Sequence, residues 1–371
     1  MKNVGTMGQF EALCKGIHPT NIFLDISRPV WIFGAGKFGR DLSSVLRKRG
    51  FNVAGFLETE PKQREISGLA VLSWLELNDI QRSMQLAIGI FNRLMPMNEL
   101  ENLAHNAGFK DIVMPWHIYA QFGDDLGWRY WLASPQLILD ALPRIKNVYQ
   151  NLADETSRTC LLNVLTFRLG RNTVYSGYKS DSNQYFNELT LPTLQGKHVT
   201  YIDGGAYNGD TYLELASIMK VATAFLFEPD LKNYKQLVNN VRKSSNQIFC
   251  LPIGLSNHYD ILSFISDGGE GSTISDHGDQ HISTVSLDEL IHHHDVNFIK
   301  FDVEGAEIPA IRGAAGLIER YRPVLAISLY HRPQDIWEIP ELISQICMNY
   351  RFYIRQHYYN SFDSVLYAVP I

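Results

Sequence analysis

The sequence predicts an α/β protein in which two strand–helix segments are joined by a helical stretch. Short apolar runs alternate with amphipathic helical patterns in the first third of the chain, and the same alternation restarts near His198. A glycine-rich turn follows the first strand of each segment, as expected where a parallel sheet passes into a helix. With 371 residues, the chain also exceeds the usual size of one hydrophobic core.

The first segment, residues 1–118, is predicted to form a small Rossmann-like parallel sheet with its helices. Its expected elements, in chain order, are Val30–Phe33, Asp41–Arg49, Val53–Leu57, Leu86–Ile90, Asn98–Ala107 and Ile112–Met114. Residues 119–197 differ, because apolar residues from Trp128 to Leu152 recur at helical spacing. This stretch is predicted to be a helical connector.

The last segment, residues 198–371, is predicted to form a second and larger Rossmann-like sheet. Its expected strands and helices are Val199–Ile202, Thr211–Met219, Ala224–Phe227, Leu231–Val241, Ile248–Pro252, Phe298–Phe301 and Val324–Leu329. Two further β-rich runs, Phe352–His357 and Val365–Val369, flank the turn-like Tyr359–Ser361. They predict a hairpin at the edge of the sheet.

Composition argues against several classes of protein. The net charge of -6 and the pI of about 6.1 offer no attraction to a phosphate backbone, so we expect no nucleic-acid partner. The four cysteines form no C-x-x-C pair, which predicts reduced thiols in the cytoplasm. No apolar stretch reaches membrane-spanning length, so we expect no membrane association. The sequence leaves homo-oligomerisation open.

The glycine-rich turn of the last segment is a candidate ligand site. Asp203 ends the strand, and the residues that follow it in the turn include Gly204, Gly205, Ala206 and Gly209. Small residues let backbone N–H groups approach a ligand closely, and the following helix adds positive potential. Because the carboxylate of Asp203 would repel an anion, the turn favours a ligand that carries an amine.

A second carboxylate follows the next strand. Glu228 lies directly after Ala224–Phe227, where a ribose diol would hydrogen-bond, which favours an adenosine-type nucleoside. The alternative is that Glu228 and Asp230 only cap the following helix. A third group, Asp302, Glu304 and Glu307, follows Phe298–Phe301. For Glu304 and Glu307 the alternative is a favourable interaction with the dipole of the next helix.

These motifs resemble the FkbM family of S-adenosylmethionine-dependent methyltransferases. The resemblance covers about His198 to Pro370 and is carried by four motifs, Asp203–Gly209, Phe227–Pro229, Leu287–Asp288 and Ile299–Glu307. Gly204 departs from it, because many members have a β-branched residue there. The resemblance implies a seven-stranded sheet with an antiparallel last strand, and methyl transfer to a hydroxyl of a small molecule or carbohydrate. It also implies that Asp203 and Gly205 approach the methionine moiety and that Glu228 binds the ribose.

His331 is the candidate general base. It follows the strand Val324–Leu329, at the same sheet edge as Asp302, and an unperturbed histidine pKa suits proton abstraction near neutral pH. The alternatives are a polar loop residue without a catalytic role, and a minor possibility of a Mg²⁺ or Mn²⁺ site at Asp302, Glu304 and His331. We expect no resident metal, and we interpret His292–His294 as a solvated helix end.

The first segment carries its own glycine fingerprint. Gly34, Gly36 and Gly39 follow a strand in the spacing G-x-G-x-x-G, and Glu58 follows the next strand, where a ribose contact is expected. Together with Ser67–Val71, this part resembles the nucleotide-binding domains of sugar-modifying acyltransferases. Two alternatives for the protein remain, an NAD-dependent nucleotide-sugar oxidoreductase or epimerase and a non-catalytic nucleotide-binding module. The absence of a Tyr-x-x-x-Lys relay counts against the first.

Overall fold

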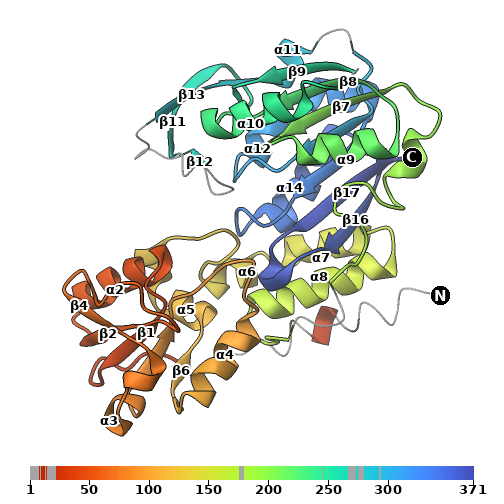
Figure 1. Cartoon of the computed structure of the whole chain (residues 1–371). Helices are drawn as coiled ribbons and strands as arrows, with labels where there is room; N and C mark the ends of the chain where they lie inside the picture. The colour runs from red at the N-terminus through yellow and green to blue at the C-terminus, as the bar shows by residue number, and fades with distance from the viewer. Residues whose placement is uncertain are drawn as a thin grey trace. The chain divides into compact units, whose positions relative to one another are not determined.

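A computed structural model describes most of the chain (Figure 1). The described residues are 8, 10–12, 14, 22–174, 179–244, 246–265, 273–274, 280–291 and 294–371. They divide into two compact units. Unit 1 comprises Met1–Pro143, Thr159–Lys179 and Tyr358–Phe362, and unit 2 comprises Arg144–Arg158, Ser180–His357 and Asp363–Ile371. None of the helices in the described ranges is long and apolar enough to cross a membrane.

Unit 1 contains a six-stranded sheet of order β3-β4-β2-β1-β5-β6. The strands are β1 (Val30–Phe33), β2 (Val53–Leu57), β3 (Glu65–Ile66), β4 (Leu69–Leu72), β5 (Gln85–Ile88) and β6 (Ile112–Val113). All pairings are parallel except that of β3 with β4. The prediction found β1, β2, β5 and β6 but missed β3 and β4, in which only Val71 is buried.

Unit 1 contains helices that match the two predicted ranges, Asp41–Arg49 and Asn98–Ala107, and further helices that were not predicted individually. They are α2 (Lys37–Lys48), α3 (Asp79–Arg82), α4 (Met97–Asn106), α5 (Pro115–Leu126) and α6 (Pro135–Asp140), with a short 3-10 helix at Trp74–Glu76. Helix α2 begins four residues before the predicted start, directly at the glycine fingerprint. The chain passes from unit 1 to unit 2 after Pro143, within α7 (Leu142–Asn151), and returns to unit 1 after Arg158, within α8 (Glu155–Arg168).

Unit 2 is built on a seven-stranded sheet of order β16-β17-β15-β14-β7-β8-β9. Its strands are β7 (Val199–Gly204), β8 (Val221–Phe227), β9 (Gln247–Leu251), β14 (Phe298–Phe301), β15 (Val324–Ser328), β16 (Tyr350–Gln356) and β17 (Ser364–Pro370). β17 runs in the opposite direction to the other six strands of this sheet. The α/β fold class, the antiparallel last strand and the hairpin at the sheet edge are therefore confirmed.

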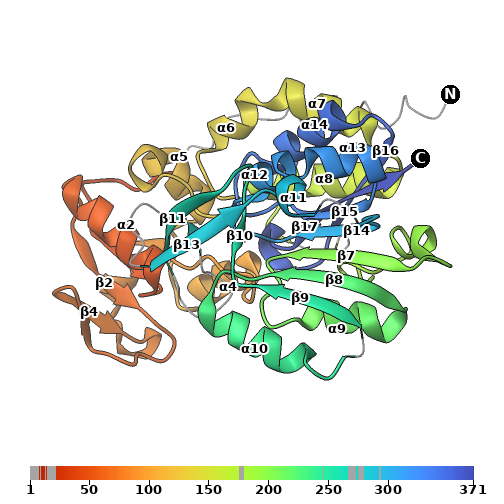
Figure 2. The ribbon, with the colours of Figure 1, turned by 90° about the horizontal axis from the view of Figure 1, so that it is seen from above.

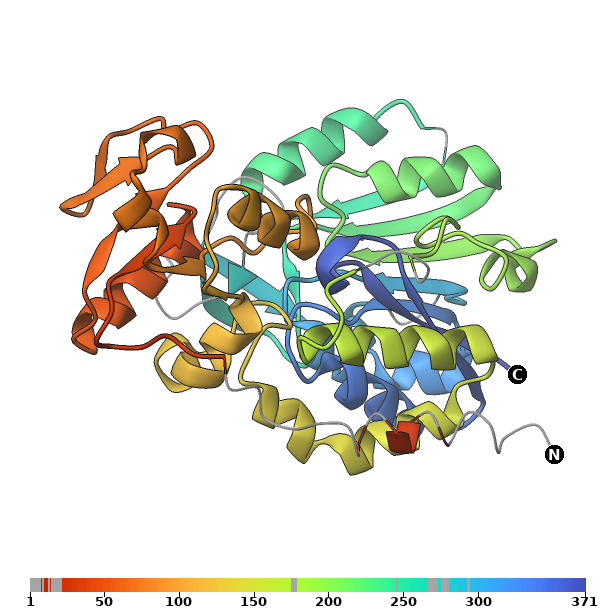
Figure 3. The ribbon, with the colours of Figure 1, turned by 90° about the horizontal axis from the view of Figure 1, so that it is seen from below.

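Helices cover both faces of this sheet. They are α9 (Asp210–Ile218), α10 (Leu231–Val241), α11 (Leu287–Leu290), α12 (Glu307–Arg312), α13 (Ala315–Tyr321) and α14 (Asp335–Ile346), with a 3-10 helix at Leu191–Leu194. The green helices α9 and α10 lie on one face, and the blue helices α12 to α14 lie on the other (Figures 2 and 3). Strands β7, β14 and β15 are buried along their whole length, as expected for a sheet that is covered on both faces.

A second sheet in unit 2 was not predicted. It has the order β10-β13-β11-β12 and comprises β10 (Gly254–Leu255), β11 (Asp260–Ile265), β12 (Thr273–Ile274) and β13 (Gln280–Val285). Most of residues 266–281 lie outside the described residues, as do His292 and His293 of the expected solvated helix end.

The turn between β16 and β17, Tyr358–Phe362, belongs to unit 1. It contains the 3-10 helix Tyr359–Ser361, and Asn360 within it has a left-handed backbone with φ of 56°. The Asn360 amide donates to the carbonyls of Asn92 and Met95 at 2.7 Å, and its oxygen accepts the N–H of Met97 at 3.0 Å. One buried side chain therefore satisfies three backbone groups of unit 1.

We expect Asn360→Ala to lower the free energy of unfolding by roughly 2–4 kcal/mol, because it leaves buried backbone groups without partners and strains a left-handed residue. Asn360→Gly is the matched variant, since it loses the same bonds but tolerates the positive φ. Asn360→Gly should therefore lower the free energy of unfolding by about 1 kcal/mol less than Asn360→Ala does. Urea denaturation measures both, and a loss below 0.5 kcal/mol for Asn360→Ala would contradict the role given to this turn.

Candidate active site

The candidate site lies where the strand order of unit 2 changes direction. The chain proceeds from β7 to β8 and β9 on one side, and β14 and β15 lie on the other side of β7. In open parallel sheets, ligands bind at the carboxyl edge beside such a point. The glycine turn after β7 lies there, and Asp302 directly follows β14, hydrogen-bonded through its N–H to the carbonyl of Gly204 at 3.0 Å.

The glycines of this turn are required by its own packing. A Cβ on Gly205, where φ is 78°, would lie 1.9 Å from the carbonyl oxygen of Asp302. A Cβ on Gly204 would lie 2.7 Å from the Phe301 ring, and Gly209 precedes α9 with φ of 86°. The N–H groups of Gly205 and Ala206 both donate to the carbonyl of Phe227, at 3.0 and 2.9 Å. The turn is therefore fixed against both neighbouring strands.

Asp203 forms a buried ion pair that the sequence argument did not include. Its carboxylate is fully buried and accepts from Lys300 Nζ at 2.9 Å and from the Tyr201 hydroxyl at 2.8 Å. Lys300 also donates to the carbonyl of Gly205 at 2.7 Å. Although burial opposes the charge, the carboxylates of Asp203 and Asp302 raise the pKa of Lys300. Asp203 is thus neutralised, which corrects the expectation that it acts as an unpaired charge repelling anions.

Glu228 lies over the turn and not at the end of a helix. Its two carboxylate oxygens accept the N–H groups of Tyr207 at 2.8 Å and of Asp230 at 2.9 Å. Asp230 instead caps α10, accepting from the N–H groups of Lys232 and Asn233. The capping alternative therefore holds for Asp230 but not for Glu228. Burial raises the pKa of Glu228 to about 7, so this carboxyl is balanced between its two protonation states near neutral pH.

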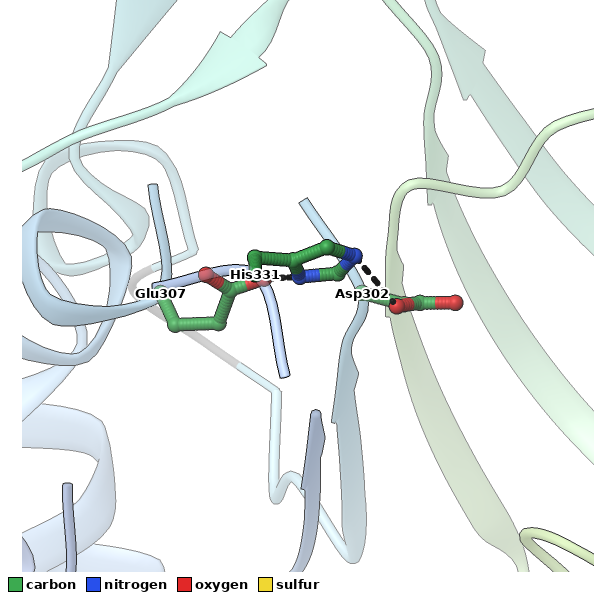
Figure 4. A group of neighbouring side chains, drawn as sticks. All are labelled: Asp302, Glu307 and His331. Carbon is green, nitrogen blue, oxygen red and sulfur yellow. Dashed lines mark hydrogen bonds and ion pairs between the residues drawn. The ribbon is translucent and has the colours of Figure 1, made fainter. Parts of the chain in front are cut away.

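Asp302, Glu307 and His331 form a second cluster at the same sheet edge (Figure 4). The imidazole lies between the two carboxylates, with Nδ1 2.8 Å from Glu307 and Nε2 3.5 Å from Asp302. Glu304 lies 3.6 Å from Nε2. Glu307 is fully buried and also accepts the N–H groups of Val303 and Gly305, which fixes the turn that carries Glu304.

The carboxylates change the titration of His331. Burial disfavours the imidazolium, but Glu307, Glu304 and Asp302 outweigh it, and the pKa of His331 lies well above its ordinary value. For Asp302, burial opposes ionisation, but the charges of His331 and Lys300 lower its pKa. The raised pKa favours the imidazolium form of His331, which corrects the expectation of an unperturbed histidine pKa.

Asp302 has hydroxyl partners that the sequence did not reveal. Its carboxylate accepts from Ser328 at 2.6 Å, from Tyr330 at 3.1 Å and from Tyr185 at 3.1 Å. Tyr185 lies in the stretch predicted to be a helical connector, and no local pattern distinguishes it. Lys300 did give a signal, because a lone charge within a buried apolar strand needs a partner.

The predicted site residues thus form three groups. Asp203, Gly204, Gly205, Ala206, Gly209 and Glu228 lie at the turn after β7, and Asp302, Glu304 and His331 lie in the second cluster. Lys300 contacts the first group directly and influences the second, since its charge lowers the pKa of Asp302. Gly34, Gly36, Gly39 and Glu58 lie in unit 1.

We expect Lys300→Met to lower the free energy of unfolding by about 3–5 kcal/mol, because it leaves the buried Asp203 carboxylate without its cation. The double variant Asp203→Asn with Lys300→Met should recover part of this loss of stability. Tyr201→Phe should lower the free energy of unfolding by less than Asp203→Asn alone or Lys300→Met alone. A double-mutant cycle by urea denaturation measures the coupling. Additive losses would contradict an ion pair that stabilises the turn.

Comparison with known proteins points to the same part of the chain. Residues 203–359 match the family model described as methyltransferase FkbM domain. The crystal structure of methyltransferase FkbM from Methylobacillus flagellatus KT is similar in fold, with a TM-score of 0.72 and 21% identity over 98% of this chain and 99% of that chain. No curated protein matches the sequence. Residues 203–359, which include Glu228, Asp302 and His331, are therefore the part of the chain that is similar to the methyltransferase FkbM domain.

Proposed function

We propose that the protein transfers a methyl group from S-adenosylmethionine to a hydroxyl of a small molecule or carbohydrate. The observation that carries this proposal is the Glu228 carboxylate, held over the glycine turn at the point where the strand order reverses. A carboxylate at the end of the second strand is suited to a ribose diol. The similarity to the methyltransferase FkbM domain supports the reaction class.

The residues of the turn fit the ribose of a nucleoside. Each Glu228 oxygen accepts one backbone N–H and retains a lone pair for a ribose hydroxyl. Asp203 acts through Lys300, which holds the carbonyl of Gly205 in place. When bound, S-adenosylmethionine supplies an electrophilic methyl group. The protein has to align the acceptor hydroxyl with that group and take up its proton.

We infer that the second cluster orients the acceptor and removes its proton. In the neutral form of His331, Nδ1–H donates to Glu307 and Nε2 is directed to the space between Asp302 and Glu304. An acceptor hydroxyl bound there would have Nε2 as its base. Because the pKa of His331 is raised, this neutral form becomes available only as the pH rises.

A divalent cation is the alternative at the second cluster. Asp302, Glu307 and His331 each offer a ligand atom within 4.8 Å of the others. Glu304 adds a fourth oxygen near His331 Nε2. An ion held by Asp302, Glu304 and His331 Nε2 would leave Glu307 as the acceptor of Nδ1–H and not as a ligand, as carboxylates are behind metal-bound histidines. Mg²⁺ or Mn²⁺ would then lower the pKa of the acceptor hydroxyl in place of the imidazole.

We expect the affinity for S-adenosylhomocysteine to fall as the pH drops below about 7. The carboxyl of Glu228 has a pKa of about 7 without ligand, and hydrogen bonds from ribose hydroxyls favour its ionised form. Binding therefore releases a proton, and calorimetry at several pH values measures the slope.

In the same calorimetry, Glu228→Gln should bind about 10- to 150-fold more weakly and lose the pH dependence. Glu319→Gln, a change at an exposed helical position, is the control and should match the parent. If Glu228→Gln binds as tightly as the parent at every pH, the cofactor does not lie at this turn.

We expect His331→Gln to lower kcat by about 10² to 10⁴ while leaving cofactor affinity nearly unchanged. The parent rate should rise with pH above neutrality, because only neutral imidazole accepts a proton, and the variant should lack that rise. Stopped assays with labelled S-adenosylmethionine across pH measure both. A variant that keeps the alkaline rise would contradict the base assignment, and loss of parent activity in EDTA with recovery in Mn²⁺ would assign the cluster to a metal.

A further inference from the structure

Unit 1 contains a cavity of about 540 Å³ at the carboxyl edge of its sheet. The loops that follow β1, β2 and β5 all line it. Strand β2 lies on one side of β1 and β5 on the other, all parallel, so the strand order reverses beside β1. Parallel sheets bind nucleotides at such a point, and the volume suits a ligand of that size.

Two glycines of the loop after β1 are required by the backbone conformation and by close packing. Gly34 has φ of 103°, and a Cβ there would lie 2.4 Å from Ile90. A Cβ on Gly39 would lie 1.9 Å from the carbonyl of Gly34, so this residue lets α2 pack closely against the turn. Both glycines are therefore required by the fold of unit 1 itself.

Gly36 has no such structural reason. Its φ is -69°, which any residue adopts, and a Cβ would meet no atom within 4 Å. Yet it lines the cavity directly before α2. A glycine at this position allows the backbone to approach a bound group closely, as the second glycine of dinucleotide-binding turns approaches a diphosphate.

The charges around Gly36 favour an anion. The 12-residue helix α2 has no capping side chain on its first turn and no acidic residue there. Its first N–H groups and its dipole therefore offer positive potential to a ligand. Lys37, Lys62 and Arg129 line the cavity together with Glu58 and Glu60, and the Arg129 guanidinium is paired with Asp41.

The other residues of the cavity suit a nucleoside. Glu58 directly follows β2 and lines the cavity, and its N–H is hydrogen-bonded to the carbonyl of Leu72 at 3.0 Å. A carboxylate in this position accepts hydrogen bonds from ribose hydroxyls. Phe91, Leu100 and Leu103 contribute apolar side chains that a base can contact.

We propose that unit 1 binds a ribonucleoside diphosphate group in this cavity, with the phosphates at Gly36 and the N-terminus of α2 and the ribose hydroxyls at Glu58. Such a group occurs in NAD and in nucleotide sugars, and both present the same chemistry to these residues. This site is an addition to the proposed methyl-transfer site, and its residues belong to a different unit.

The test measures binding of ADP, NAD⁺, UDP-glucose and adenosine by calorimetry to the full-length chain saturated with S-adenosylhomocysteine, which occupies the proposed methyl-transfer site. We expect at least one diphosphate ligand to bind, and adenosine to bind at least tenfold more weakly than ADP. Tighter binding of NAD⁺ identifies a dinucleotide site, and tighter binding of UDP-glucose identifies a nucleotide-sugar site. No binding of any diphosphate ligand at millimolar concentration, or equal affinity for adenosine and ADP, would overturn the proposal.

Variants locate the site within unit 1. Gly36→Val should weaken diphosphate binding at least tenfold and lower the melting temperature only slightly, since a Cβ there meets no atom within 4 Å and only the N-cap preference of α2 is affected. Glu58→Gln should reduce the preference for ADP over 2′-deoxy-ADP. Lys110→Ala, at an exposed position in unit 1, is the control. A Gly36→Val variant with parental affinity and stability would overturn the proposal, and S-adenosylhomocysteine affinity should be unchanged in every variant.

Discussion

The buried ion pair between Asp203 and Lys300 is the interaction on which the candidate active site depends. It joins neighbouring positions of β7 and β14, and Lys300 also holds the carbonyl of Gly205. Both side chains are almost completely buried, so neither charge is stable without the other. The pair therefore fixes the glycine turn and, through its positive charge, stabilises the ionised form of Asp302.

Charge balance links the rest of the site. Asp302, Glu304 and Glu307 place three carboxylates around His331, and the imidazolium compensates part of this charge. A cationic ligand or a metal ion entering the cluster would compete with the proton on His331. The same cluster can therefore serve proton transfer or metal binding, and the choice depends on which positive charge is present.

Local patterns predicted most strands, because buried parallel strands appear as short apolar runs such as β14 and β15. They did not predict the sheet of β10 to β13, where β10 and β12 have only two residues each and β13 is only partly buried. The turn residues and Glu228 could be selected from their positions after strands. The partner of Asp203 is 97 residues away, and the pKa of His331 depends on three carboxylates of the distant segment 302–307, so neither followed from local sequence.

The assignment of Tyr358–Phe362 to unit 1 has a consequence for biosynthesis. The carbonyls of Asn92 and Met95 and the N–H of Met97 receive their partner only when Asn360, close to the end of the chain, has been made. Because synthesis proceeds from the N-terminus, the sheet of unit 1 can form early, but the unit cannot be completed before most of unit 2 has left the ribosome. A fragment that ends before Asn360 therefore lacks part of unit 1, although it contains every strand of its sheet.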